Sequence, residues 1–171
     1  MSVRLLLHVF ILTLENRLHI CYHFCMVITI DTSVLFQAFY SSRGASHQII
    51  RLVRSGELTM AISVPVFQEY RDILSRYENQ SALNLEEDDV DVIMQFIATI
   101  GKPTNISYRW QPNLRGENDN MIVELARASG SAFLVTRNTK DFQIEADLQN
   151  DDIRIVTPGE FIRRWRESHE E

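Results

Sequence analysis

Four acidic side chains stand where a parallel sheet would bring them together. Asp31 directly follows the apolar run VITI, and Glu69 lies in a helix-patterned segment after a second apolar run. Asp119 falls in the first turn of a later helix-patterned segment, and Asp141 comes shortly after the apolar run that ends at Thr136. Ligands of open parallel sheets bind beyond the carboxyl ends of the strands, so we expect these acids to converge there.

Converging carboxylates predict a bound cation, because they repel one another unless their pKa values rise, donors surround them or a cation binds. A ligand set made of oxygens indicates Mg²⁺ or Mn²⁺ rather than zinc or copper. Such an ion lowers the pKa of a bound water and neutralises charge on a phosphodiester under attack, which indicates metal-assisted phosphodiester hydrolysis. Thr32, Ser33 and Thr136 lie beside the acids in the sequence, and we expect their hydroxyls to orient the carboxylates.

The elements that must position the acids are short β-branched runs that alternate with longer helix-patterned segments. This alternation is typical of an α/β fold with three layers, α/β/α, and a mainly parallel central sheet. The expected strands are Val27–Ile30, Thr59–Ser63, Thr104–Ser107, Ala132–Thr136 and Ile153–Val156. The expected helices are Val34–Tyr40, Ser46–Ser55, Val64–Tyr77, Glu86–Ile100, Asn118–Ser129 and a last helix opened by Thr157-Pro158-Gly159-Glu160. Asn84 with Glu87 predicts a cap before the fourth of these helices.

Composition restricts the class of protein. The chain has 171 residues, 45% of them apolar, with 17 basic and 23 acidic side chains and a formal net charge of −6. The length and apolar fraction predict one compact domain, and the net charge argues against broad coating of nucleic acid by positive charge. Cys21 and Cys25 provide no disulfide framework, so we expect a reducing, cytoplasmic location.

The first 25 residues differ from the rest. Val3–Leu14 is apolar but shorter than the about 20 residues that a membrane span needs, and no small-residue cleavage site follows it. We interpret residues 1–25 as an N-terminal extension or a start-site artefact, and residues 26–171 as the folded domain. A zinc site is a less favoured alternative for this segment, because alternating ligands on one strand do not converge tetrahedrally; its ligands would be His19, Cys21, His23 and Cys25.

Four segments, in this order and at these spacings, resemble the PIN-domain family of metal-dependent ribonucleases, which includes VapC-type toxins of prokaryotic toxin–antitoxin pairs. They are VITIDTSVL, SVPVFQEYRDIL, RGENDNMIVELARASGSAFLVTRNTKDF and IRIVTPGEFI, and the resemblance covers essentially residues 26–165. The resemblance implies that Asp31, Glu69 and Asp119 are metal ligands. It places Asn138 and Asp141 at two positions where relatives carry a further acid, so that Asp141 is a ligand and Asn138 supports it. The chain departs from the family at residue 116, a glycine where similar proteins usually have Asp.

The same resemblance implies the function and the partners. The chain would be a Mg²⁺- or Mn²⁺-dependent endoribonuclease, the toxin of a type II toxin–antitoxin pair, with RNA as substrate and a small antitoxin protein as partner. A homodimer is also common among similar proteins, and the segments Val64–Tyr77 and Glu86–Ile100 are its candidate surfaces. Arg115 and Arg137 flank the acids, and we expect them to contact RNA phosphates.

Two alternative functions stay open. One is a binding module that keeps the PIN-like fold but has lost catalytic strength through Gly116 and Asn138. The other is an RNA-processing nuclease without an antitoxin. A phosphatase of the haloacid dehalogenase type is disfavoured, because Ser33 stands where that chemistry needs a second Asp, and the sequence contains no phosphate-binding P-loop string.

Overall fold

The computed structural model describes residues 26–106, 117–142 and 153–169, so the extension 1–25 lies outside the described residues. Five strands form one sheet in the order β3-β2-β1-β4-β5, and each neighbouring pair is parallel. The strands are β1 (Met26–Ile30), β2 (Leu58–Ile62), β3 (Gly101–Pro103), β4 (Phe133–Val135) and β5 (Arg154–Val156). The helices are α2 (Thr32–Tyr40), α3 (Ala45–Ser55), α4 (Val64–Ser75), α5 (Tyr77–Leu83), α6 (Glu87–Ile100), α7 (Glu117–Ser129) and α8 (Pro158–Glu167).

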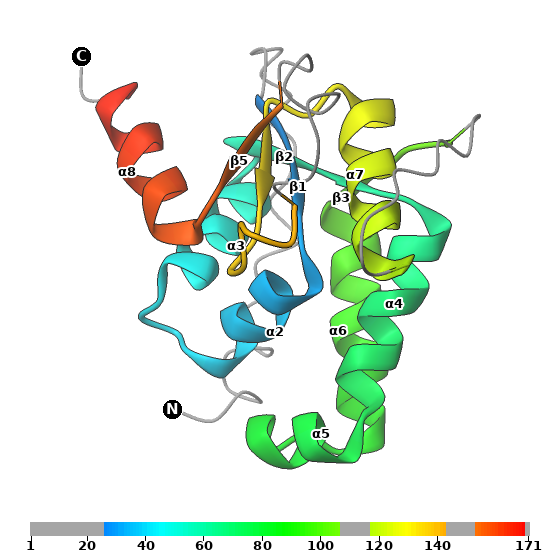
Figure 1. Cartoon of the computed structure of the whole chain (residues 1–171). Coiled ribbons are helices and arrows are strands. Elements are labelled where there is room, and N and C mark those ends of the chain that lie inside the picture. Colours follow the sequence, from blue (N-terminus) through cyan, green and yellow to red (C-terminus); the bar gives the residue numbers. More distant parts are fainter. Residues whose placement is uncertain (1–25, 107–116, 143–152, 170–171) are drawn as a thin grey trace.

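Helices cover both faces of the sheet, which confirms the three-layer α/β/α fold (Figure 1). On one face α3 packs against α8, and α2 lies next to α3. On the other face α7 lies against β1, β2 and β4, and α4 packs between α7 and α6. Within the part of the chain that the structure describes, no helix combines the length and the apolar character needed to cross a bilayer.

The central strand β1 is buried on both faces, as a strand between two helical layers must be. Ile28, Thr29 and Ile30 are each 0% exposed. The buried hydroxyl of Thr29 has a partner, because it lies 2.9 Å from the hydroxyl of Ser131. Pairing with β2 on one side and β4 on the other fixes β1, and therefore the position of the residue that follows it.

The predicted strand Thr104–Ser107 is wrong, because the edge strand lies three residues earlier. Helix α6 passes directly into β3 at Gly101 without a loop. A Cβ atom at this position would lie 2.9 Å from the carbonyl oxygen of Ile97 and 3.0 Å from Cγ2 of Ile62, so the close passage requires glycine. Because β3 is an exposed edge strand that contains Pro103, it lacks the buried apolar run by which the other strands are predicted.

Two helix ends also differ in detail from the sequence pattern, which does not predict α5. Asn84 ends α5 in the left-handed conformation, with φ 52° and ψ 49°, and so does not cap α6. The cap of α6 is Glu86, whose backbone N–H donates to Asp89 Oδ2 at 2.9 Å. The predicted cap of the last helix is confirmed: the Glu160 N–H donates to Thr157 Oγ1 at 3.3 Å, and the Thr157 N–H donates to the Glu160 carboxylate at 2.9 Å.

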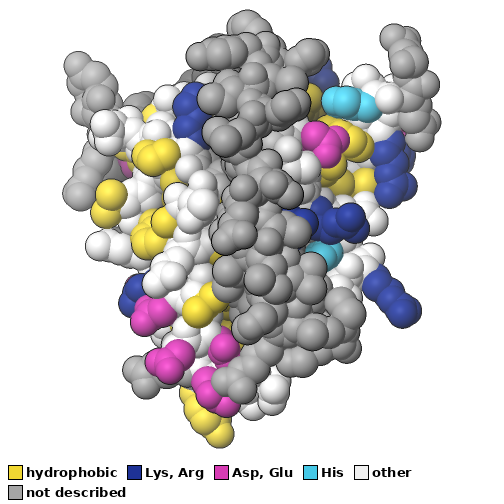
Figure 2. Space-filling model, turned by 180° about the vertical axis from the view of Figure 1, so that it is seen from behind, with side chains coloured by type: hydrophobic (Ala, Val, Ile, Leu, Met, Phe, Trp, Pro, Cys, Tyr) yellow, Lys and Arg dark blue, Asp and Glu magenta, His cyan; other side chains and the backbone are white. Residues whose placement is uncertain are grey.

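Acidic side chains gather at the start of α6, where Glu86, Asp88 and Asp91 are exposed. Figure 2 shows acidic side chains grouped toward the lower end of the molecule, where Figure 1 places α5 and the beginning of α6. Asp91 pairs with Arg71 of α4 at 2.9 Å. Acidic residues are favoured at helix N-termini, so we interpret this run as a solvated helix start.

Candidate metal centre

The residue that follows each strand carries a hydroxyl or a carboxyl group, and these five residues form a row along the carboxyl edge of the sheet. In spatial order the row is Thr104, Ser63, Asp31, Thr136 and Thr157. Backbone hydrogen bonds continue the strand ladder into the row: the Asp31 N–H donates to the carbonyl of Val135 at 2.9 Å, and the Thr136 N–H to that of Val156 at 3.0 Å. Asp31 therefore occupies the middle of the row, next to a hydroxyl residue on either side.

Three hydroxyl groups donate hydrogen bonds to the half-buried carboxylate of Asp31. Thr32 donates to Oδ1 at 3.1 Å, and Ser33 donates to Oδ2 at 2.5 Å. Thr136, which is fully buried, donates to Oδ2 at 2.9 Å across the β1–β4 pair. A carboxylate has about four acceptor positions, so three donors fix its orientation and leave Oδ1 the capacity to bind a cation. These are the three hydroxyls that the sequence predicts to orient the acids.

A chain of hydrogen bonds links Asp31 to Asp141. The hydroxyl of Thr136 donates to Asp31 and accepts the backbone N–H of Asn138 at 3.1 Å. The Asn138 side-chain amide donates in turn to Asp141 Oδ2 at 2.5 Å. Asn138 thus supports Asp141 rather than Asp31, and it occupies one carboxylate oxygen of a predicted ligand.

Tyr70 fixes the peptide group that precedes Asp31, and sequence reasoning missed it. Its hydroxyl donates to the carbonyl oxygen of Ile30 at 2.7 Å, and the residue is 0% exposed. Burial, together with the negative charge of Asp31, raises the pKa of the Tyr70 hydroxyl, so this group stays a protonated donor. The available signal was that Tyr70 lies on the same helix stripe as the buried residues Val66 and Leu74, and a buried tyrosine hydroxyl needs a partner.

Burial and nearby charges act on the carboxyl group of Glu69. Burial raises its pKa most, the positive charge of Arg76 lowers it, and the negative charges of Asp72 and then Asp31 raise it. Glu69 could instead be a helix residue paired with Arg71 or a neighbouring arginine; Arg71 pairs with Asp91, whereas the charge of Arg76 acts on Glu69. The charge of Asp31 therefore contributes to the pKa of Glu69 as the weakest of these four causes.

The other predicted site residues are described in part. Asp119 lies in the first turn of α7, whose N-terminus is at the carboxyl edge of the sheet beside β1 and α4 (Figure 1); its side chain lies outside the described residues. Arg137 directly follows Thr136 and is exposed. Arg115 and Gly116 lie outside the described residues. Asp31 and the hydroxyl residues of the row lie at one edge of the sheet.

The donor set fits a hard divalent cation. Among the side chains that the structure describes, which exclude that of Asp119, no group of three His, Cys, Asp or Glu residues is close enough to hold a metal ion. However, Asp31 and Glu69 offer carboxylate oxygens only, the ligands that hard divalent cations prefer, and a cation would favour the charged form of Glu69. Asp31, Glu69, Asp119 and Asp141 are thus the residues that could hold Mg²⁺ or Mn²⁺.

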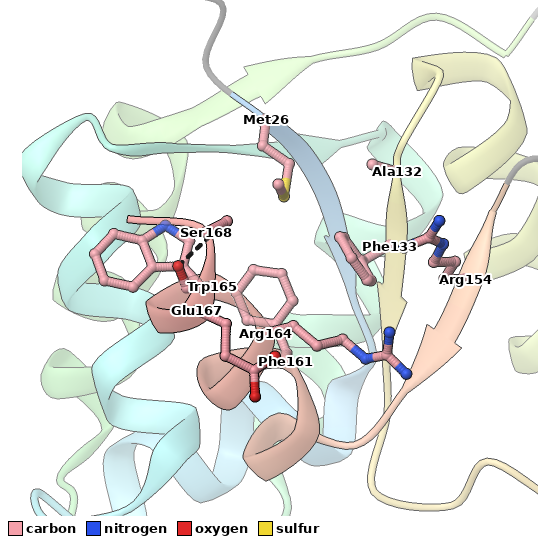
Figure 3. A pocket seen from close by; sticks show the side chains of 9 residues that line it. All are labelled: Met26, Ala132, Phe133, Arg154, Phe161, Arg164, Trp165, Glu167 and Ser168. Atoms are coloured by element: carbon pink, nitrogen blue, oxygen red, sulfur yellow. Dashed lines mark hydrogen bonds between the residues drawn. The ribbon is translucent and has the colours of Figure 1, made fainter. Parts of the chain in front are cut away.

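A cavity of about 580 Å³ lies at the opposite, amino edge of the sheet (Figure 3). Met26 and Arg154, the first residues of β1 and β5, line it together with Phe161 and Trp165 of α8. Asp31 lies at the other end of β1, so this cavity is separate from the carboxylates.

The parallel sheet with an acidic residue at the centre of its carboxyl edge defines the chain as an α/β domain built around a carboxylate centre. The family model of the PIN domain matches residues 27–140, a range that includes Asp31, Glu69 and Asp119. The chain belongs to the PIN-domain family, whose members are nucleases.

Among solved structures, the chain is similar to one in the crystal structure of VapBC2 from Rickettsia felis bound to a DNA fragment from their promoter. The two are 20% identical in sequence, the match covers 77% of this chain and 98% of the other, and the TM-score is 0.50. At this identity the similarity supports the fold. No curated protein matches the chain.

Proposed function

We propose that the chain is a Mg²⁺- or Mn²⁺-dependent endoribonuclease and the toxin of a type II toxin–antitoxin pair. The observation that carries the proposal is the carboxylate of Asp31, held by three hydroxyl donors at the carboxyl edge of the sheet. Membership of a nuclease family supports the reaction class. Residues 26–171 would form the nuclease domain, and residues 1–25 an extension or a start-site artefact.

In this proposal Asp31, Glu69, Asp119 and Asp141 hold the ion. When bound, Mg²⁺ or Mn²⁺ supplies a water of lowered pKa and neutralises charge on the phosphodiester. The hydroxyls of Thr32, Ser33 and Thr136 keep the Asp31 carboxylate in one orientation, and Asn138 does the same for Asp141. Burial is the main cause of the raised pKa of Glu69, and a bound cation would favour the charged form of this carboxyl.

RNA would approach over the carboxyl edge, where Arg115 and the exposed Arg137 provide contacts to its phosphates. These contacts are local, as the net charge of −6 requires. The same charge suits an antitoxin that inserts a basic segment toward the acids, since charge complementarity aids recognition. The similar solved structure is of two proteins, VapBC2, on DNA from their promoter, which supports a partner of this kind. A homodimer and a cytoplasmic location complete the proposal.

The test is cleavage of total RNA with and without Mn²⁺, by the wild type and by the Asp31→Asn and Asp119→Asn variants. Both variants should lose cleavage. Asp88→Asn, at an exposed position near the start of α6, is the matched control and should cleave as the wild type does. Cleavage that persists in Asp31→Asn would contradict the metal-centre assignment.

A binding module without strong catalysis is the second candidate. It is favoured by the hydrogen bond through which Asn138 occupies an oxygen of Asp141, because that oxygen is then less available to an ion. Calorimetric titration with Mn²⁺ separates the two functions. Absent binding, together with no effect of Asp31→Asn on RNA cleavage or growth arrest, would favour the module. A small gene encoded beside this one distinguishes a toxin from an RNA-processing nuclease.

A further inference from the structure

A cavity of about 480 Å³ opens at the carboxyl edge of the sheet, between the start of α4, the end of β3 and α6. This volume lies within the range of about 300–1,000 Å³ that is typical of small-molecule sites. The residues that determine its chemistry are Ser63, Phe67, Gln68, Arg71, Thr104 and Asn105.

Ser63 forms part of the floor of the cavity. The residue is 5% exposed, and its Oγ, which is closed to solvent, has no hydrogen-bond partner among the described residues. It is the cap residue of α4, but its side chain makes no cap hydrogen bond. Because Oγ faces away from solvent, Ser63 shapes the cavity and the contacts to a ligand come from the other lining residues.

One stripe of α4 forms a wall of the same cavity. Arg71 lies four residues after Phe67 and three after Gln68, the spacings of neighbours on a helix surface. The ring of Phe67 is half-buried, and Gln68 is exposed. Opposite them, beyond β3, stands the exposed Asn105. An aromatic ring with two amide groups, each both donor and acceptor, can stack a nucleobase and read its edge.

The cavity lies next to the carboxylates. Ser63 follows β2 and Asp31 follows β1, and the two strands pair in parallel with Ile28 opposite Met60, so Ser63 and Asp31 are neighbours in the row. Ser63 and Val64, at the start of α4, line the cavity, and the N-terminus of this helix carries the partial positive charge that suits a phosphate. Arg71 adds a cation at the rim; it pairs with Asp91 in solvent, where such pairs are weak.

On the basis of the proposed ribonuclease function, we propose that this cavity is a subsite for one nucleobase of the RNA strand beside the phosphodiester cut at Asp31. The base stacks on Phe67, and the side-chain amides of Gln68 and Asn105 bond its polar edge. These three residues therefore determine which base is accepted next to the cut.

In the test, the wild type and two variants cut a random-sequence RNA pool, and the cut ends are sequenced. Gln68→Ala removes an edge contact, and Phe67→Leu removes the aromatic face but keeps an apolar side chain of similar size. Gln80→Ala, on α5 at the far end of the molecule from the sheet, is the matched control (Figure 1). We expect the wild type and Gln80→Ala to share a base preference at one position beside the cut, and the other two variants to lose at least about fivefold of it.

A second arm does not depend on cleavage. The four nucleoside 5′-monophosphates are titrated into each full-length protein without metal, and the wild type should favour one or two of them by a margin that Gln68→Ala and Phe67→Leu remove. If the wild type cleaves RNA but neither variant changes the base preference, the subsite is overturned and the nuclease stands. If the wild type does not cleave RNA, the proposed nuclease function fails, and the nucleotide titration alone decides the subsite. In that case the subsite is overturned if the wild type binds all four nucleotides equally or binds none.

Light scattering on the same samples tests the alternative that a second copy of the chain, and not a nucleobase, occupies the cavity. If Phe67→Leu turns a dimer into a monomer while the base preference stays, this face is a contact between copies, which overturns the subsite.

Discussion

The hydroxyl of Tyr70 offers a sharp test of how the carboxylate edge is held. Tyr70→Phe keeps the buried ring and deletes the donor that lies 2.7 Å from the Ile30 carbonyl oxygen. Removing the partner of a buried polar group costs about 1–3 kcal/mol. For a chain of this length, 1 kcal/mol corresponds to about 2–4 °C in Tm, so the Tm should fall by about 2–12 °C.

The effect should also reach the metal centre, because Ile30 directly precedes Asp31. A backbone that is less firmly held should weaken Mn²⁺ binding by about tenfold, the lower part of the range seen when groups that support a metal ligand are lost. Thermal unfolding and calorimetric Mn²⁺ titration measure the two effects on one sample. Tyr77→Phe is the matched control: Tyr77 is 82% exposed, and its loss of a hydroxyl should change stability by less than about 0.5 kcal/mol. The reasoning is refuted if Tyr70→Phe has the same Tm as Tyr77→Phe and binds Mn²⁺ as tightly as the wild type.

Three further predictions concern other residues of the edge. The pKa of Glu69 is raised from 4.5, so the stability that its protonated form provides is lost as pH rises through the interval above 4.5. Metal-free Glu69→Gln should therefore have a higher Tm than the wild type near pH 7 and an equal Tm near pH 4. A Tm difference that does not change with pH in thermal melts would contradict the raised pKa. Thr136→Val keeps the shape of a fully buried side chain but deletes a donor to Asp31, so calorimetry should show Mn²⁺ affinity about 10–100-fold weaker, and an unchanged affinity would exclude an orienting role. Thr157→Ala removes the cap of α8 and should lower stability by about 0.5–2 kcal/mol in denaturant unfolding; equal stability would mean that the cap is not what holds the start of α8.

The sequence allowed most of the architecture to be predicted because the buried elements leave strong patterns. β1 and β2 are apolar runs interrupted by one threonine each, and α8 opens with a hydroxyl cap, a proline and a glutamate. The elements that were missed have little buried surface. In α5 only Leu83 is buried, and β3 is a largely exposed edge strand with the sequence Gly-Lys-Pro. Neither element therefore shows a hydrophobic periodicity from which it could be predicted.

The candidate site also has parts that local sequence predicts and parts that it does not. The place of Asp31 follows from local sequence, since a residue just after a buried parallel strand must lie at the carboxyl edge. Its neighbours Thr32 and Ser33 follow from adjacency. The hydrogen bond from Tyr70 to Ile30 joins residues 40 apart and depends on how α4 lies against the sheet. That contact is set by three-dimensional packing, which a single sequence does not display.

The central place of β1 has a consequence for synthesis of the protein. Asp31 leaves the ribosome early, but its partner Thr136 comes 105 residues later, and β5 later still. At about 5–20 residues per second, translation needs about 5–20 s to deliver Thr136 after Asp31. During that time the nascent chain has an unfinished sheet, so a message cut short before β4 encodes a polypeptide without the assembled edge.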